Sequence, residues 1–520
     1  MRAGFVATLA GIALASFAVV AQAAAPAAPV VTVGADIKQL QFDWAQVPGS
    51  NTYELWFKAN DGAAWVKYTQ ISAAMTPRIR INASVHLLDW RQAKYRVAAC
   101  NPSGCTNSGE VGVADLPLEA MGYFKPNAAG NNSEYGMNVA LSADGTTFAV
   151  ISGETIGSAM HSAVVNVYRK TTPTSGWRRE ARLVPSSVQS STAPLYMGGP
   201  LALSGDGSLL VLGLMSESPP GTGTAEGAGA VYLFRRVGTT WHQEQKLAGE
   251  DSYQNWFGLA VDVDDAGSTL AVWARHTIQP QQFGFTEIFR HTASGWVFDH
   301  SIPHVPAGQS YLQTCWGMAL SGDGRTLVRS CSRTNGANNV QIIDTTKSAP
   351  GATLPLVYND QGSIDINGDG TRLAVRDGPS IGIYSLANGA WTLEDSLSQN
   401  SGTGQLSNIA LSRDGKILAV GDERNSRAGT GPQYPPLAFS SGTPSSGAVQ
   451  LYERKSSGWS LRRMVKPGSE TAQQSGHTVA LGDNGKILAA GAPFDSSAAT
   501  GIDGDRADTS APERGAAWLY

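Results

Sequence analysis

Four cysteines are the side chains with the most definite chemistry in this sequence, and they fall into two local pairs. Cys100 and Cys105 flank the turn sequence Asn-Pro-Ser-Gly, while Cys315 and Cys331 each lie eight residues from Asp323, at the centre of a second turn. Residues that face each other in a hairpin lie close enough to form a disulfide. We therefore expect the disulfides Cys100–Cys105 and Cys315–Cys331, which fit an oxidising compartment.

The histidines offer little further chemistry. His300 and His304 are four residues apart, but Pro303 between them argues against the helix that would direct both rings at one zinc ion. The sequence contains no H-E-x-x-H and no C-x-x-C motif. We assign no catalytic residue, although a site assembled from several strands leaves an enzyme open as an alternative.

Composition narrows the class of protein. The chain has 520 residues, of which 42% are hydrophobic and 15% charged, and its formal net charge is -4. This charge balance argues against a nucleic-acid binder, which needs a basic surface to neutralise phosphates. The 59 glycines suit many short strands joined by tight turns.

The first residues have the pattern of an export signal. A basic start, an apolar run and the small residues Ala21-Gln22-Ala23 predict a signal peptide over residues 1–23. An uncleaved anchor is the alternative. No later stretch is apolar enough for a membrane-spanning helix. We expect a monomer that is secreted or periplasmic, with attachment to the cell surface as a further alternative.

Short alternating strands fill residues 27–116. This region resembles a fibronectin type III module, because Trp44 matches the core tryptophan of the second strand, and Tyr95, Val97 and Ala99 match the Y-x-V-x-A run of the sixth. The resemblance implies an immunoglobulin-like sandwich that serves as a spacer or adhesion module.

A phrase of strand, Asp-Gly or Asn-Gly turn, and second strand recurs seven times in residues 118–520. Such dipeptides supply the positive φ that hairpin turns need. The turn glycines are Gly145, Gly207, Gly267, Gly324, Gly370, Gly415 and Gly485. A third strand follows each phrase, and a tryptophan opens most of the fourth strands: Trp177, Trp241, Trp296, Trp391 and Trp459. Four strands repeated seven times predict an all-β chain with a seven-bladed β-propeller after the front sandwich.

The last repeat ends at Tyr520 after three strands. We expect residues 121–126, just before the first repeat, to supply its missing fourth strand. This pairing would close the ring and remove the exposed edges of an open array.

The repeats resemble FG-GAP repeats of the integrin α type, in the secreted bacterial variety. Tyr135-Gly136, Phe257-Gly258 and Trp316-Gly317 match the F-G pair, and Gly491-Ala492-Pro493 matches G-A-P. The repeated phrase also occurs in WD40-like and TolB-like propellers, so the subfamily stays open.

The FG-GAP resemblance implies a calcium loop of the form D-x-N-x-D-G with an acid at its ninth position. Asp365, Asn367 and Asp369 match this form, but Leu373 occupies the ninth position and offers no oxygen to Ca²⁺. A plain turn is the alternative reading. A second acidic cluster consists of Asp503, Asp505 and Asp508.

The connections between second and third strands are long and dissimilar, above all residues 421–446 and 491–514, which belong to neighbouring blades. Variable loops on a rigid scaffold often carry binding. We expect one patch formed by Asp422, Arg424, Arg427, Tyr434, Asp495, Asp503, Asp505 and Arg506. The alternative is that these loops are merely tolerated insertions.

The sequence thus predicts a secreted, non-catalytic binding or adhesion protein that recognises a protein or a glycan. One alternative is an extracellular carbohydrate-active or other hydrolytic enzyme with its site on the propeller face. Another is a periplasmic scaffold of an envelope complex.

Overall fold

The computed structural model describes most of the chain. The described residues are 24–127, 132–156, 159–172, 175–187, 199–217, 227–248, 255–278, 281–305, 313–333, 338–349, 351–357, 363–398, 408–434, 442–469, 471 and 473–520. The predicted signal peptide, residues 1–23, lies outside them. In the part of the chain that is described, no helix has the length and apolar character required to cross a bilayer.

The chain divides into two compact units. The first unit takes in residues up to 33, 42–79 and 91–113, and the second takes in 34–41, 80–90 and 114–520. The second unit therefore includes two short segments from within the region 27–116.

The early strands form two sheets. The three-stranded sheet has the order β1-β2-β5, and the five-stranded sheet has the order β4-β3-β6-β7 with β8 beside β6. The aromatic side chains Phe42 and Trp44 of β2 pack on Tyr95 and Tyr53 of the other sheet, with ring centroids 4.9 and 5.0 Å apart. The strands are β1 (Val31–Asp36), β2 (Gln39–Trp44), β3 (Thr52–Lys58), β4 (Val66–Ser72), β5 (Arg78–Asn82), β6 (Lys94–Asn101), β7 (Gly104–Asn107) and β8 (Val111–Gly112).

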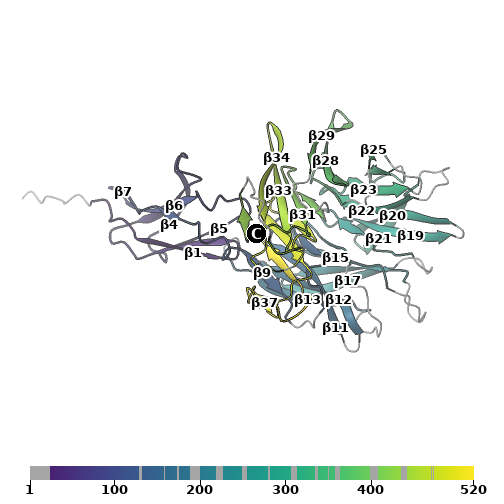
Figure 1. The fold of residues 1–520 in the computed structure, drawn as a ribbon, viewed down its shortest axis with the longest axis horizontal. Helices are drawn as coiled ribbons and strands as arrows, with labels where there is room; N and C mark the ends of the chain where they lie inside the picture. The colour runs from purple at the N-terminus through teal and green to yellow at the C-terminus, as the bar shows by residue number, and fades with distance from the viewer. Residues whose placement is uncertain are drawn as a thin grey trace, which may run out of the picture. The chain divides into compact units, whose positions relative to one another are not determined.

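The second unit is a succession of antiparallel sheets, most of them four-stranded (Figure 1). The first three sheets consist of β10 (Val139–Leu141), β11 (Thr147–Ile156), β12 (Ala159–Arg169) and β13 (Arg178–Leu183); β14 (Leu201–Leu203), β15 (Leu209–Leu214), β16 (Ala230–Val237) and β17 (Thr240–Ala248); and β18 (Val261–Val263), β19 (Thr269–Ile278), β20 (Gln281–Thr292) and β21 (Gly295–Pro303). The next two consist of β22 (Gln313–Leu320), β23 (Thr326–Arg333), β24 (Asn338–Asp344) and β25 (Thr353–Leu356); and β26 (Ile364–Ile366), β27 (Arg372–Asp377), β28 (Ser380–Ala387) and β29 (Ala390–Ser398).

Two five-stranded sheets follow. The first has the order β30-β31-β33-β34-β32 and the second β35-β36-β38-β9-β37. Their strands are β30 (Ile409–Leu411), β31 (Ile417–Asp422), β32 (Pro432–Gln433), β33 (Ala448–Lys455), β34 (Gly458–Val465), β35 (Val479–Gly482), β36 (Ile487–Ala492), β37 (Gly501–Ile502), β38 (Ala516–Leu519) and β9 (Gly122–Lys125).

The first strands of these sheets form a closed cycle. Contacts run from β10 to β14, β18, β22, β26, β30 and β35 in turn, and β35 contacts β10 again. Sheets that fan from such a cycle of inner strands make a β-propeller. The all-β prediction is confirmed.

The last sheet is completed from the front of the second unit. β9 pairs with β38, so that Phe124 lies opposite Ala517 and Tyr123 opposite Trp518. The two long connections each return a two-residue strand to an outer edge: β32 pairs with β34, and β37 pairs with β9. The sequence predicts both connections as surface loops, and these two short strands are the difference that the structure shows.

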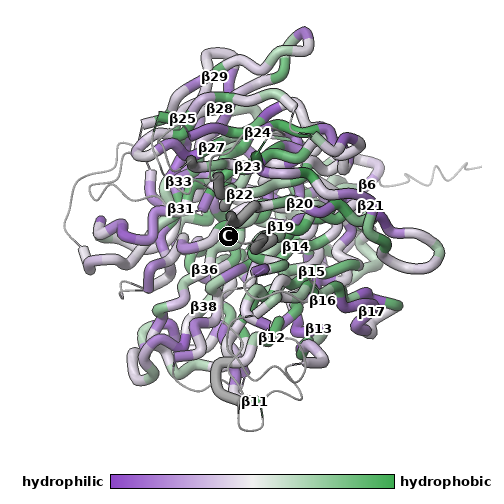
Figure 2. The backbone as a smooth tube through the Cα atoms, turned by 90° about the vertical axis from the view of Figure 1, so that its right-hand side faces the viewer, coloured by the Kyte–Doolittle hydropathy of each residue, from purple (hydrophilic) through white to green (hydrophobic). Residues whose placement is uncertain are grey.

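The core lies along the inner and middle strands. Every residue of β15 is buried, whereas β17 at the outer edge of the same sheet is mostly exposed. Figure 2 shows the same contrast, with β15 in the hydrophobic colour and β17 largely in the hydrophilic one.

Both predicted disulfides are confirmed. Cys100 is bonded to Cys105, and Cys315 is bonded to Cys331. The second bridge joins β22 to β23, where the two cysteines lie directly opposite each other.

Candidate functional site

The tryptophan that opens a fourth strand usually bonds to the fourth strand of the preceding sheet. This contact recurs at three junctions between sheets and fills the outer space between them. The contacts are Trp241 Nε1 to Glu180 Oε2 (3.0 Å), Gln245 Nε2 to the Trp296 carbonyl (2.9 Å), and the Trp459 amide to Asp395 Oδ2 (2.9 Å).

Trp391 opens β29 but lacks such a partner. The preceding fourth strand, β25, has only four residues, while the other fourth strands from β13 to β34 have six to nine. β25 pairs with β24 only as far as Gln341, opposite Thr353. Among the described residues, no side-chain hydrogen bond of Trp391 is present. The truncated strand therefore leaves a gap beside this indole.

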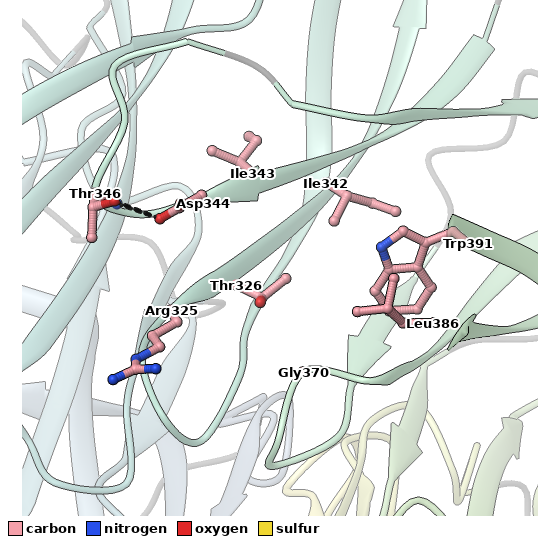
Figure 3. Close-up of a pocket in the computed structure, with 9 residues that line it drawn as sticks. All are labelled: Arg325, Thr326, Ile342, Ile343, Asp344, Thr346, Gly370, Leu386 and Trp391. Atoms are coloured by element: carbon pink, nitrogen blue, oxygen red, sulfur yellow. Dashed lines mark hydrogen bonds between the residues drawn. The ribbon is translucent and has the colours of Figure 1, made fainter. Parts of the chain in front are cut away.

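The gap is a groove of about 550 Å³ between the β22–β25 and β26–β29 sheets. Figure 3 shows Trp391, Leu386 and Ile342 together on one side, with Arg325 and Asp344 across from them. Leu386 is 38% exposed and Trp391 is half-buried. The other lining residues are Thr326, Ile343, Thr346 and Gly370.

The hairpin after β24 is held away from Trp391 by the sheet on its other side. An Arg290 Nη atom donates to the carbonyl of Thr345 (2.6 Å), and His300 Nε2 lies 3.0 Å from the carbonyl of Lys347. Thr345 also donates through its hydroxyl to the carbonyl of Gly324 (2.7 Å). This wall of the groove is therefore fixed in place.

The charges at the rim are unequal. Asp344 accepts hydrogen bonds from the amide (3.0 Å) and hydroxyl (2.7 Å) of Thr346, and its other oxygen lies 3.1 Å from Lys347 Nζ. The bonds from Thr346 are the main cause that lowers the pKa of Asp344 to about 2. Arg325 is exposed, and its guanidinium makes no hydrogen bond or ion pair within the described part of the chain. Among the described residues that line the groove, Arg325 thus carries a positive charge that no ion pair neutralises.

A second cavity, of about 240 Å³, is lined by the inner strands of the cycle. Alanine occupies the middle of most of these strands, but Asp262 and Asp365 take that position in β18 and β26. Asp262 Oδ2 accepts from the amide of Leu320, and Asp365 Oδ2 from the amide of Leu411, each at 2.7 Å. Burial is the main cause that raises the pKa of Asp262 to about 7 and of Asp365 to about 6.

Arg413 lies at one end of this cavity. It forms an ion pair of 2.5 Å with Asp265, which comes from a turn three sheets earlier in the cycle. Glycine at position 322 leaves room for the pair, because a Cβ there would lie 2.2 Å from Asp265 Oδ2.

The predicted calcium residues serve the local backbone. Asn367 Oδ1 accepts from the amides of Thr371 (2.9 Å) and Arg372 (2.8 Å), and Asp369 Oδ1 accepts from the Thr371 hydroxyl (2.6 Å). Asp365 reaches the next sheet instead. The three side chains therefore do not face one common point, and calcium binding here stays a prediction.

One further grouping of possible metal ligands occurs in the described part of the chain. Among the described residues, the His, Cys, Asp and Glu side chains that approach closely enough to hold an ion are Glu54, Cys100 and Cys105. Their two thiols are consumed by a disulfide.

Asp495 of the predicted patch is buried and holds the last sheet together. Its Oδ1 lies 2.7 Å from Lys125 Nζ and accepts from the Tyr123 hydroxyl at 2.8 Å. Two other sheets have a similar arrangement, an acid in or just after the second strand paired with a base on the fourth. Those pairs are Glu154 with Arg182 (2.6 Å) and Glu217 with Lys246.

Asp503 and Arg506 also contact β9 and the segment before it. Asp503 Oδ1 accepts from the Tyr123 amide (3.0 Å), and Arg506 donates to the carbonyls of Leu118 (2.7 Å) and Met121 (3.0 Å). Burial raises the pKa of Asp503. Asp505 is exposed and accepts from the amide of Ala507.

The patch residues of the other loop have mixed surroundings. Asp422 is buried and accepts from Asn425 (2.9 Å) and Gln450 (3.1 Å). The Tyr434 hydroxyl accepts from the Trp90 amide (2.8 Å), and its ring lies 4.3 Å from the guanidinium carbon of Arg463. Arg424 is exposed and Arg427 partly so. Ligand binding by this patch stays a prediction.

Residues 378–382 match the G-x-S-x-G pattern of a nucleophile elbow. That motif requires a strand, a sharp turn and a helix. Here Ser380 begins β28 directly after β27, and it lies opposite Asp377 in a hairpin. The match therefore does not have the required context.

The groove beside Trp391 is the feature that sequence reasoning missed. A signal was present, since the fourth repeat is the one between Trp296 and Trp391 that has no tryptophan of its own to open a fourth strand. The groove lies at the end of the sheets where the turns between first and second strands and the hairpins between third and fourth strands are found. The predicted patch belongs to the opposite ends of the strands.

No family model and no curated protein matches the chain. Similar solved structures include the β-propeller domain of Myceliophteria thermophila Cps50 (Swd1), at 15% identity and a TM-score of 0.45, covering 70% of this chain and 94% of that one. The Dos1 propeller is similar at 10% identity and a TM-score of 0.41, covering 76% and 94%. The Pseudomonas aeruginosa periplasmic gluconolactonase PpgL is similar at 13% identity and a TM-score of 0.40, covering 72% and 90%. The strand pairing of the chain shows the β-propeller by itself.

Proposed function

We propose that this chain is an exported, non-catalytic binding protein. It consists of a fibronectin type III-like module and a seven-bladed propeller of FG-GAP-like repeats. The two disulfides support an oxidising compartment outside the cytoplasm. The sheets joined in a cycle, with β9 completing the last one, support the propeller.

The observation that carries the binding function is the groove beside Trp391. Its volume of about 550 Å³ falls in the range of small-molecule sites, about 300–1,000 Å³. It combines an apolar wall with polar groups at the rim, the usual composition of such sites. A protein or a glycan docked on the propeller would bury Trp391 and Leu386.

The chemistry of the groove favours binding over hydrolysis. Most glycoside hydrolases need two carboxyl groups, one of which is protonated near neutral pH. Among the described residues that line the groove, Asp344 carries the one carboxyl group, and its pKa of about 2 keeps this group ionised. It is therefore a poor proton donor.

The test is capture from glycan arrays and from envelope extracts by the immobilised full chain. We expect a ligand that the wild type retains and that Trp391→Ala releases, while Trp391→Phe retains it in part. Mass spectrometry of the recovered ligand should find it unchanged. A ligand returned in shortened or hydrolysed form would overturn the non-catalytic proposal.

A second candidate function rests on Asp262 and Asp365. Two carboxyl groups with raised pKa values in one cavity resemble the acid–base pairs of enzymes. On this alternative the chain is an enzyme with its site at the axis of the propeller. Asp262→Asn and Asp365→Asn would then each abolish turnover of a captured ligand, without weakening its capture.

A further inference from the structure

We infer that the groove beside Trp391 binds an acidic saccharide, a short oligosaccharide that contains hexuronic acid. This inference rests on the proposed binding function and names its ligand class. It follows from the chemistry of the two opposing sides of the groove.

The apolar side matches the C–H face of a sugar ring. The half-buried indole of Trp391 provides a flat surface, and Leu386 and the buried Ile342 extend it. A pyranose presents one face of C–H groups, which loses contact with water when it stacks on an indole. Trp241, Trp296 and Trp459 each bond to the preceding fourth strand, whereas no side-chain hydrogen bond of Trp391 is present among the described residues.

The polar side matches the edge of the same ring. Thr326 and Thr346 offer hydroxyl groups, and the ionised Asp344 accepts hydrogen bonds from sugar hydroxyls with its remaining lone pairs. These groups lie across the groove from the indole (Figure 3). A ring stacked on Trp391 would therefore direct its hydroxyl groups toward them.

The charge balance selects an acidic sugar. Asp344 forms an ion pair with Lys347 at 3.1 Å, whereas the guanidinium of Arg325 forms no ion pair with the described residues. A guanidinium binds a carboxylate through two parallel hydrogen bonds. The carboxylate of a hexuronate at the ring edge supplies this partner, whereas a neutral sugar leaves Arg325 without one.

The experiment is isothermal titration of the full chain with trigalacturonate, with maltotriose as a neutral trisaccharide of equal length. We expect trigalacturonate to bind at least about tenfold more tightly, since a hydrogen bond to a charged group contributes roughly that much. Arg325→Gln should remove this preference and leave weak binding of both sugars. Trp391→Ala should abolish both.

The matched control is Lys416→Gln, which removes an exposed cation from the same turn position of another sheet. It should leave the affinity for trigalacturonate unchanged. Added salt should lower the affinity for trigalacturonate but not the affinity for maltotriose. All variants are checked for an unchanged melting temperature, and Trp391→Phe serves if Trp391→Ala does not fold.

Several outcomes would overturn the inference. Equal binding of both trisaccharides at Trp391 would reject the acidic class but keep the proposed function. Binding of trigalacturonate that survives both groove substitutions would reject the site. Capture of a peptide or protein that Trp391→Ala abolishes, with no saccharide bound, would reject the saccharide class. Cleavage of trigalacturonate during titration would instead reject the non-catalytic function.

Discussion

The buried ion pair between Lys125 and Asp495 is expected to hold β9 in the last sheet. The two side chains are 0% and 1% exposed, and Lys125 Nζ lies 2.7 Å from Asp495 Oδ1. The same oxygen accepts from the Tyr123 hydroxyl. Burial lowers the pKa of Lys125, and the charge of Asp495 opposes this effect.

Removing one partner should cost much more than removing both. Asp495→Leu leaves a buried ammonium without its counter-ion, at about 3–5 kcal/mol, and a buried Tyr123 hydroxyl without an acceptor, at about 1–3 kcal/mol. Lys125→Met should cost about 3–5 kcal/mol for the same reason. The double variant keeps the costs at the Tyr123 hydroxyl and at the Ser497 amide, which also donates to Asp495 Oδ1 (3.1 Å), because replacing a buried pair with apolar groups is itself often neutral.

The assay is urea unfolding of the wild type, both single variants and the double variant, which gives the coupling free energy of the pair. We expect a coupling of about 3 kcal/mol or more in favour of the pair. Lys486 and Asp483, an exposed pair in the same sheet, serve as the control, with an expected coupling of about 0–1 kcal/mol. Additivity of the Lys125 and Asp495 variants within about 0.5 kcal/mol would refute the reasoning.

Further predictions concern the disulfide, the axial carboxyl groups and the groove. Replacing Cys315 and Cys331 together with serine should lower the free energy of unfolding by about 2–4 kcal/mol, measured by urea titration, because the bridge restrains the unfolded chain. The folded-state pKa values of Asp262 and Asp365, about 7 and about 6, exceed the unfolded value near 4, so the folded state binds more protons between these limits. Stability should therefore fall as pH rises from about 4 to about 7, and melting curves of the Asp262→Asn/Asp365→Asn variant should lose this part of the dependence; an identical slope in both proteins would contradict it. Trp391→Ala should shift the melting temperature less than the removal of a fully buried tryptophan, which costs about 3–5 kcal/mol, because its ring is only partly buried and makes no side-chain hydrogen bond to the described residues.

The hairpins could be predicted from sequence because their turns are local. Asp-Gly and Asn-Gly steps require a positive φ, and the structure has it at Gly145 and Gly485. The Cys315–Cys331 bridge was predicted from equal spacing about Asp323. The structure reaches the same pairing differently, since the hairpin is centred one half-residue later and a bulge between Cys315 and Gly317 restores the register.

The outer edges could not be predicted in the same way. β32 and β37 have two residues each, and their pairing depends on which edges the rest of the sheet leaves open. The partner of the Asp495 side chain could not be predicted from local sequence either. Its loop reads as a variable surface connection, but the carboxylate meets Lys125, which is 370 residues earlier in the chain.

The groove exists because the fourth strand β25 is short, and a repeat pattern in the sequence does not show the length of a strand. The recurring tryptophans predict filled junctions between sheets. At Trp391 the partner strand β25 is too short to reach it, and the hairpin beyond β24 is bonded to the other neighbouring sheet. Only the three-dimensional arrangement brings Arg325 to the same space.

A crystal structure of the full chain soaked with trigalacturonate tests the central claim most directly. The account predicts a sugar ring stacked on Trp391, with its carboxylate bonded to the guanidinium of Arg325. Trigalacturonate bound over the loops of residues 421–446 and 491–514, with the groove beside Trp391 left empty, would contradict it.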